Sequence, residues 1–314
     1  MTTIRDIARL SGYSVSTVSR VINQRNYVSP ATRMAIQKVV DQLDYAPNAV
    51  ARDLSRGRTF NVGVVLPHSD HPYFTQLVHG IMRAAFKANY RVVLLPSKYE
   101  VNLERGYLAD LRQHAYDVLI FTSHGLPLTE LNDYRRYGTI VVCENPHDCP
   151  IPAAYAARQT TYVEAFELLK QRGDRRVAIL ASRSLAKSAT TQAMVAAYQQ
   201  VFGTKPAAAL VCTGVTTPAD GERAGQTLLK QSQPVDAVLT NGDDIAVGLL
   251  RAYRAAKVSA PFLIGQEHQP SGEALRLPTI DHHFETVGAR AFQLAVSGEV
   301  AQIPVDSQLV VPET

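Results

Sequence analysis

Short apolar runs alternate with helix-forming segments from residue 61 onward. The runs are rich in Val, Ile and Leu, which is typical of strands buried in a parallel sheet. Between the first two runs, residues 73–88 place apolar side chains at helical spacing. The predicted strands are 61–66, 91–96, 117–121, 139–143, 176–180, 208–212, 237–240 and 262–265. This alternation predicts a doubly wound α/β domain with parallel sheets, divided near residue 160 into two similar lobes.

Residues 1–58 have a different pattern, which predicts three short helices. Thr3 can cap a first helix, and Gly12 can end it. Ser14 can cap a second helix, and the pair Ser29-Pro30 starts a third. Apolar residues at helical spacing predict a shared core, namely Ile7, Ala8, Val18, Val21, Ile22, Ile36, Val39, Val40 and Leu43. We therefore predict an all-α headpiece ahead of the α/β domain.

The second predicted helix turns its polar side outward. Burial of Val18 and Val21 leaves Val15, Ser16 and Arg20 on the outer face. In the helix-turn-helix mode such a helix enters the major groove N-terminus first, where an arginine can bind guanine in a bidentate manner. The short polar side chains of Thr17, Ser19 and Asn23 suit phosphate oxygens. The alternative is a three-helix bundle that binds nothing.

The basic charge of the chain is concentrated in this segment. The whole chain has a net charge of +4, from 32 basic and 28 acidic residues. Residues 1–58 hold nine of the basic residues and four of the acidic ones, so the remainder is almost neutral. A basic module on a neutral body is the footprint of a protein that meets phosphates at one end. A merely solvated basic face is the alternative, although it leaves the ordered motif unexplained.

Three stretches together resemble the DNA-binding headpiece of the lactose-repressor (LacI/GalR) family. They are TIRDIARLSGYSVSTVSRVIN, YVSPATR and LDYAPNAVARDLSRGRT. The resemblance implies a repressor, most often of carbohydrate-metabolism genes, that binds a near-palindromic double-stranded operator as a homodimer, one headpiece per half-site. The predicted DNA-binding residues of the headpiece are Thr3, Arg5, Ser14, Val15, Ser16, Thr17, Ser19, Arg20, Asn23, Tyr27, Ser29 and Thr32.

A hinge helix is predicted at about residues 47–56. Pro47 can start it and Gly57 can stop it, but so short a helix is marginal in water by itself. We expect it to form when its apolar residues are buried on DNA. The resemblance implies that Asn48 and Ala51 approach the minor groove and that Leu54 wedges between base pairs. Without the resemblance, Leu54 is as easily explained as interdomain packing.

Residues 59–314 are predicted to bind an effector and to dimerise. Ligands of open α/β sheets bind at the carboxyl ends of strands, which directs attention to residues 67–74, 122–125, 241–244 and 265–268. The resemblance extends through the final DSQLVVPET and implies a periplasmic-binding-protein-like effector domain. The predicted effector-binding residues are Tyr73, Phe74, Ser123, Met194, Gly242, Asp243 and Glu267. For Tyr73 and Phe74, core packing is the alternative.

Three positions depart from the pattern of that family. Met194 stands where an effector-binding arginine is common, Gly242 where an asparagine is common, and Glu267 where a sugar-binding aspartate is common. Methionine cannot supply the bidentate fork of an arginine. The departures leave two alternatives. The chain binds an unusual effector, or it has lost small-molecule control and uses a phosphocarrier protein as co-repressor. The expected small-molecule effector is a sugar or a sugar phosphate.

Two other classes of protein share parts of this pattern. A solute-binding protein of a transporter would share the two lobes, but it needs an export signal where this chain has a headpiece. An α/β enzyme is not indicated, because phosphate-binding glycine loops and a nucleophile elbow are missing from the sequence. Cys143, Cys149 and Cys212 lack metal or redox spacing, so no metal or cofactor is expected. The lack of a membrane-length apolar run, and of a C-terminal heptad tail, predicts a cytoplasmic dimer.

Overall fold

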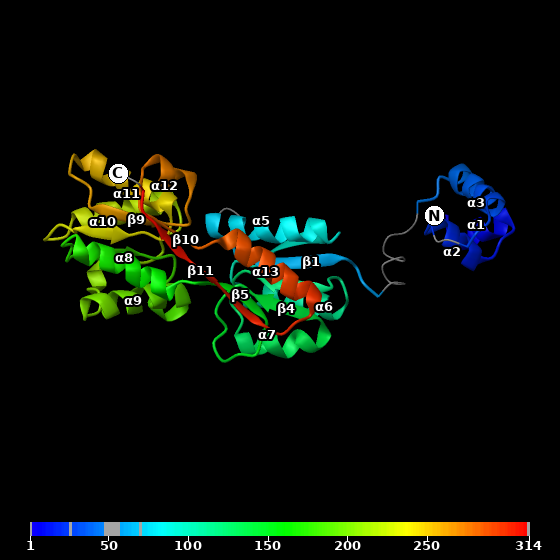
Figure 1. Ribbon diagram of the computed structural model, residues 1–314, viewed down its shortest axis with the longest axis horizontal. Helices are drawn as coiled ribbons and strands as arrows, with labels where there is room; N and C mark the ends of the chain where they lie inside the picture. Colours follow the sequence, from blue (N-terminus) through cyan, green and yellow to red (C-terminus); the bar gives the residue numbers. More distant parts are fainter. Residues whose placement is uncertain (1, 25–26, 47–56, 69–70, 313–314) are drawn as a thin grey trace. The chain divides into compact units, whose positions relative to one another are not determined.

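The computed structural model describes residues 2–24, 27–46, 57–68 and 71–312 (Figure 1). The chain forms two compact units, Met1–Thr59 and Phe60–Thr314. Each unit is described by itself.

The first unit is a bundle of three helices, α1 (Ile4–Ser11), α2 (Val15–Ile22) and α3 (Pro30–Gln42). Each begins at a hydroxyl-bearing cap, as predicted: the side chains of Thr3, Ser14 and Ser29 accept hydrogen bonds from backbone N–H groups in the first turn. The side chains of Ile7, Val18 and Ile36 are fully buried and form the centre of the core. The predicted hinge helix at residues 47–56 lies outside the described residues.

The first lobe of the second unit is built on a parallel sheet, in the order β11-β5-β4-β3-β1-β2. Its strands are β1 (Asn61–Leu66), β2 (Arg91–Pro96), β3 (Val118–Phe121), β4 (Thr139–Val142), β5 (Ala153–Ala157) and β11 (Gln302–Asp306). Alternate residues of each strand face opposite layers, which gives two apolar clusters. One cluster lies beneath α5 (Pro72–Lys87) and α13 (Phe284–Ser297), and the other beneath α6 (Val101–Arg112) and α7 (Leu128–Tyr134).

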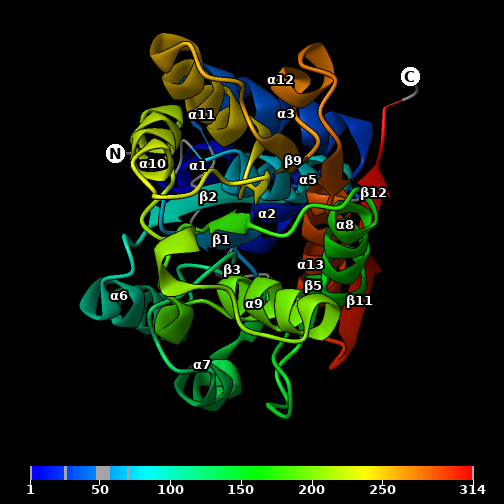
Figure 2. The same cartoon turned by 90° about the vertical axis from the view of Figure 1, so that its left-hand side faces the viewer.

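The second lobe repeats this plan with the strand order β12-β10-β9-β8-β6-β7. Its strands are β6 (Val177–Leu180), β7 (Val211–Cys212), β8 (Ala237–Leu239), β9 (Phe262–Gln266), β10 (Thr279–Asp281) and β12 (Gln308–Val310). On one face lie α8 (Gln159–Gln171) and α9 (Ala189–Phe202), and on the other α10 (Pro218–Leu229) and α11 (Asp243–Ala256), as Figure 2 shows. The short α12 (Pro270–Ala274) follows β9.

The chain passes between the lobes three times in its described part. The passages are Arg158 after β5, His282-His283 after β10, and Ser307 between β11 and β12. Hydrogen bonds join two of them, because Nδ1 of His282 lies 2.8 Å from Oγ of Ser307. Two of the three connections are therefore joined by a hydrogen bond where the chain passes between the two sheets.

The predicted fold class, a two-lobed α/β domain, is confirmed, but the number and direction of its strands need correction. All eight predicted strands are present, although residues 208–212 contribute only the two-residue β7. The sequence analysis missed β5, β10, β11 and β12. It also predicted parallel sheets throughout, whereas β12 pairs with β10 in the antiparallel sense. The strands run in opposite directions because β10 ends at the passage into the first lobe, whereas β12 begins at the passage out of it.

Candidate DNA-reading helix and ligand cavity

The outer face of α2 presents short side chains and one arginine to solvent. Val15 is 44% exposed, and Ser16 and Arg20 are also exposed. Val18 and Val21 on the opposite face are buried against α1 and α3, so the rotation of α2 is set by the core. The surface formed by Val15, Ser16 and Arg20, here called the α2 face, can enter a groove without disturbing that core.

Several predicted DNA-binding residues also hold the helices together. Thr3, Ser14 and Ser29 are the three helix caps, and Ser14 Oγ lies 2.9 Å from the hydroxyls of both Ser16 and Thr17. These hydroxyl groups retain exposed surface. They can therefore donate outward to phosphate oxygens while they accept from the backbone.

Other predicted contacts lie around this face. Ser29 Oγ donates to Oγ1 of Thr32, and the amide nitrogen of Asn23 donates to the carbonyl of Ser19 at 2.8 Å. Arg5 is exposed in the first turn of α1, and Tyr27 is 98% exposed. The Tyr27 ring is therefore accessible to another molecule. Asn48, Ala51 and Leu54 lie outside the described residues.

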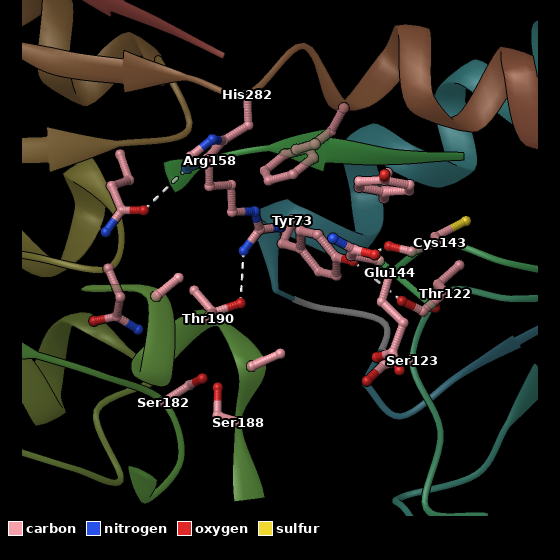
Figure 3. Close-up of a pocket in the computed structure, with 18 of the residues that line it drawn as sticks. Tyr73, Thr122, Ser123, Cys143, Glu144, Arg158, Ser182, Ser188, Thr190 and His282 are labelled. Carbon is pink, nitrogen blue, oxygen red and sulfur yellow. Dashed lines mark hydrogen bonds between the residues drawn. The ribbon is translucent and has the colours of Figure 1, made fainter. Parts of the chain in front are cut away.

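A cavity of about 880 Å³ lies between the two lobes, at the carboxyl ends of the strands (Figure 3). Residues from both lobes line it, among them Tyr73, Phe74, Ser123 and Glu267 of the predicted effector-binding set. Strand β3 runs into Ser123, β6 into Ser182 and β8 into Asn241, so the strand-end rule accounts for the position of the cavity.

Two aromatic residues of α5 are held mainly by packing. The hydroxyl of Tyr73 donates to the carbonyl of Thr122 at 3.1 Å, and its ring meets the Phe284 ring edge-on at a centroid distance of 4.6 Å. Phe74 is buried against Tyr73. Both rings therefore line the cavity and also belong to the buried core. Effector contact and core packing, the two alternatives drawn from the sequence, are thus compatible at these positions.

Three predicted effector-binding residues do not line the cavity. Met194 is buried, and its sulfur lies 3.6 Å from Nε2 of Gln266. Gly242 is the N-cap of α11. The carboxylate of Asp243 accepts hydrogen bonds from the backbone N–H of Gln269 and the hydroxyl of Thr279, both at 2.7 Å. These contacts give all three residues structural roles.

Glu267 is buried where the lobes meet. Its backbone carbonyl accepts a hydrogen bond from Nε2 of Gln76 at 2.9 Å, across the lobe boundary. Its carboxyl oxygen lies 3.8 Å from Nδ1 of His71. Burial raises the pKa of Glu267 well above its usual range, the nearby Asp243 raises it further, and Arg158 opposes both. Burial therefore favours the protonated form of this side chain, which can donate a hydrogen bond as well as accept one.

The sequence analysis missed two arginines in the cavity wall. Arg158, on the first passage between the lobes, donates to Oγ1 of Thr190 at 2.7 Å, and its guanidinium lies over the rings of Tyr73 and Phe284 (Figure 3). Arg183 lies 4.6 Å from the centre of the Tyr99 ring. Arg183 stands three residues beyond β6, so the strand-end rule could have found it. Arg158 follows β5, which was not predicted.

A paired carboxylate completes the first-lobe wall. Glu144 lies 2.8 Å from Nε2 of His124. Burial works against both charged forms, but this hydrogen bond and the mutual attraction outweigh it, so the pKa of His124 is raised and that of Glu144 is lowered. The buried Glu104 holds the adjacent loop by accepting from the backbone N–H groups of Gly125 and Leu126.

Neither a metal site nor a membrane span was found in the described part of the chain. No group of three or more His, Cys, Asp or Glu side chains there is placed to hold a metal ion. Among the same residues, every helix is too short or too polar to cross a bilayer.

Two family matches cover most of the chain. Residues 3–48 match the family described as "Bacterial regulatory proteins, lacI family". Residues 59–297 match the family described as "Periplasmic binding proteins and sugar binding domain of LacI family". The first match lies within the unit Met1–Thr59, and the second begins at residue 59, next to the start of the unit Phe60–Thr314.

Individual relatives span nearly the full length. The chain is 36% identical to catabolite control protein B of Bacillus subtilis (strain 168), over 97% of each protein. It is 26% identical to the ribose operon repressor of Halalkalibacterium halodurans, over 100% of this chain and 97% of the relative. Its fold is similar to the solved lac repressor dimer bound to operator and the anti-inducer ONPF, with a TM-score of 0.84, 22% identity, and coverage of 100% and 98%.

Proposed function

The chain belongs to the LacI family of bacterial regulatory proteins, and on that premise we propose that it represses transcription as a homodimer on a near-palindromic operator. The single observation that carries this proposal is the α2 face. It presents Val15, Ser16 and Arg20 on a helix whose buried side is fixed by Val18 and Val21. Entry of α2 into the major groove places Arg20 within reach of a base edge.

A second copy of this chain is the proposed partner in the dimer. On the first lobe, Phe86 is 84% exposed and Met82 is 49% exposed, one turn apart on α5, and Leu94 of the edge strand β2 is 47% exposed. Neighbouring apolar side chains on one face favour burial in a protein interface. Two headpieces held by a two-fold symmetric body would match two half-sites related by the same symmetry.

Control by a small molecule is supported by the cavity. Its wall comes from both lobes, and Arg158, which lines it, lies on the first passage between them. A ligand that binds one lobe arrangement more tightly shifts the equilibrium by that difference in affinity, and so changes DNA affinity. A sugar or sugar phosphate suits a cavity of about 880 Å³ better than a docked phosphocarrier protein does. A repressor of carbohydrate-metabolism genes acting in the cytoplasm fits this assignment.

The stoichiometry and symmetry of the complex test the proposal. Duplexes enriched from a random pool by the full-length chain are expected to share a two-fold symmetric consensus. Sedimentation is expected to give two chains per duplex. Asymmetric enriched sites occupied by one chain would overturn the homodimer on a palindromic operator.

A further inference from the structure

We propose that the cavity selects a sugar phosphate over the corresponding neutral sugar, and that Arg183 and Arg158 bind the phosphate. The inference rests on the proposed control by a small molecule and names the ligand class of that same site. Three observations support it. They are the two guanidinium groups in the cavity wall, the groups that pair with the carboxyls of that wall, and a buried side-chain oxygen that accepts no hydrogen bond within the described residues.

Arg183 brings a positive charge that no protein carboxylate bonds. Its guanidinium lies over the Tyr99 ring, close enough to Glu144 to help lower the pKa of that carboxyl, but within the described part of the chain the guanidinium forms no hydrogen bond or ion pair of its own. The side chain is half-buried in the cavity wall. A partly desolvated guanidinium gains most from an anion that accepts in a bidentate manner, and phosphate oxygens have the geometry for it.

Arg158 adds a second positive charge held in a fixed position. One nitrogen, Nη1, bonds to Thr190, while the aromatic rings of Tyr73 and Phe284 lie 5.6 and 5.3 Å from the guanidinium carbon. These contacts leave donor groups of the fork unused, because guanidinium has five N–H donors. Two arginines from neighbouring elements match the two negative charges that a phosphate monoester approaches at neutral pH.

The carboxyl groups in the wall do not cancel these charges. Glu144 is bonded to His124 at 2.8 Å, so its charge already has a partner. Glu267 is buried, and burial raises its pKa and so disfavours its charged form. The histidines His68, His71 and His147 also line the cavity. The wall as a whole therefore favours an anion.

Serine hydroxyl groups and a side-chain amide oxygen in the cavity wall supply the remaining contacts to the sugar phosphate. Ser182 and Ser188 lie together below Thr190 in Figure 3, on the second-lobe side of the cavity. Within the described residues, Oδ1 of Asn241 is buried and accepts no hydrogen bond, while its amide nitrogen donates to the carbonyl of Val215 at 2.7 Å. A buried acceptor of this kind calls for a donor, which a sugar hydroxyl provides.

Matched pairs of ligands and variants test the inference. Binding to the full-length chain is measured by calorimetry and thermal shift at constant ionic strength. The probes are glucose 6-phosphate, fructose 6-phosphate and ribose 5-phosphate, each beside its unphosphorylated parent, with gluconate and inorganic phosphate alongside. The variants are Arg183→Gln and the control Arg175→Gln, because Arg175 is exposed and precedes β6, whereas Arg183 follows it.

At least one phosphorylated probe is expected to bind tenfold or more tightly than its parent sugar. Arg183→Gln is expected to weaken that binding at least tenfold, and Arg175→Gln to leave it unchanged. Three results overturn the inference: a neutral sugar or gluconate binding more tightly than every phosphorylated probe, no binding by any phosphorylated probe, or equal affinities in wild type and Arg183→Gln.

Operator binding by the same preparations separates this inference from the proposed function. Without any probe, wild type and the control Arg175→Gln are both expected to bind a selected duplex with equal affinity, because Arg175 is exposed and does not line the cavity. Preserved operator binding together with a failed phosphate preference refutes only the ligand class. Loss of specific DNA binding by the wild type refutes the proposed function itself.

Discussion

Arg158 and Thr190 join a passage between the lobes to the first turn of α9 through a hydrogen bond of 2.7 Å. The same guanidinium lies over the rings of Tyr73 and Phe284, which belong to the first lobe. One side chain thus contacts both lobes through different chemistry, aromatic on one side and polar on the other. A change in the lobe arrangement must alter at least one of these contacts.

A double-mutant cycle on this pair is the first prediction. Arg158→Met removes a charged hydrogen bond and two cation–π contacts, and it is expected to lower the free energy of unfolding by about 2–4 kcal/mol. Thr190→Val removes only the hydrogen bond, with an expected loss of about 1–2 kcal/mol. Urea unfolding of both single variants and the double variant gives the coupling energy, expected at about 1 kcal/mol or more. Additive effects would show that the bond contributes nothing.

The buried acid Glu267 predicts a pH dependence. Its pKa is higher in the folded chain than in the unfolded chain, mainly because of burial. Between the two pKa values the folded state holds a proton that unfolding releases, so rising pH favours unfolding. Glu267→Gln removes this effect. The stability of Glu267→Gln relative to wild type is therefore expected to increase as the pH rises above the usual pKa of a glutamic acid, in chemical unfolding experiments. An ion pair with His71 would give the opposite trend.

Helices α5 and α13 approach each other closely at Gly80. One added methyl group there is expected to destabilise the fold. A Cβ on Gly80 would lie 2.0 Å from the backbone carbonyl of Glu285, and backbone cannot yield as a flexible side chain can. Gly80→Ala is expected to lower the free energy of unfolding by about 1–3 kcal/mol. Gly106→Ala on α6 is the control, since its Cβ would meet nothing within 4 Å, and helix propensity predicts a gain of up to about 1 kcal/mol there. Equal effects of both substitutions would contradict the packing argument.

The α2 face predicts a change in DNA preference. Arg20→Ala is expected to cost about 1–3 kcal/mol of specific binding and to relax the preference at one base pair in each half-site. Lys38→Ala is the control, because Lys38 is exposed on α3, the helix that supports the other two. Selection of bound duplexes from a random pool measures both. An unchanged consensus with Arg20→Ala would remove Arg20 from base recognition.

Prediction from sequence succeeded where periodicity was strong. The caps at Thr3, Ser14 and Ser29 and the core around Ile36 followed from local chemistry. The missed strands have weaker patterns: β5 is largely alanine, β10 has three residues, and β11 contains Pro304 and alternates in exposure. Their pairing is decided by distant partners, which a local pattern does not contain.

The dependence on distant parts of the chain also explains why some cavity residues were missed or misassigned. Arg158 follows β5, so an unpredicted strand concealed a cavity residue. Met194 was assigned to the effector by its position, whereas its side chain packs beside Gln266, which Tyr162 and His282 also contact. Side-chain direction depends on this buried network, and residue spacing along one helix does not reveal it.

Competition between a selected duplex and bulk DNA tests the central claim most directly. The full-length chain is titrated with a labelled duplex from the selection, in the presence of excess unrelated DNA at fixed moderate salt, because the electrostatic part of binding changes with salt. The account predicts a preference of about 10³-fold or more for the selected duplex. Equal affinity for the selected duplex and bulk DNA would contradict it.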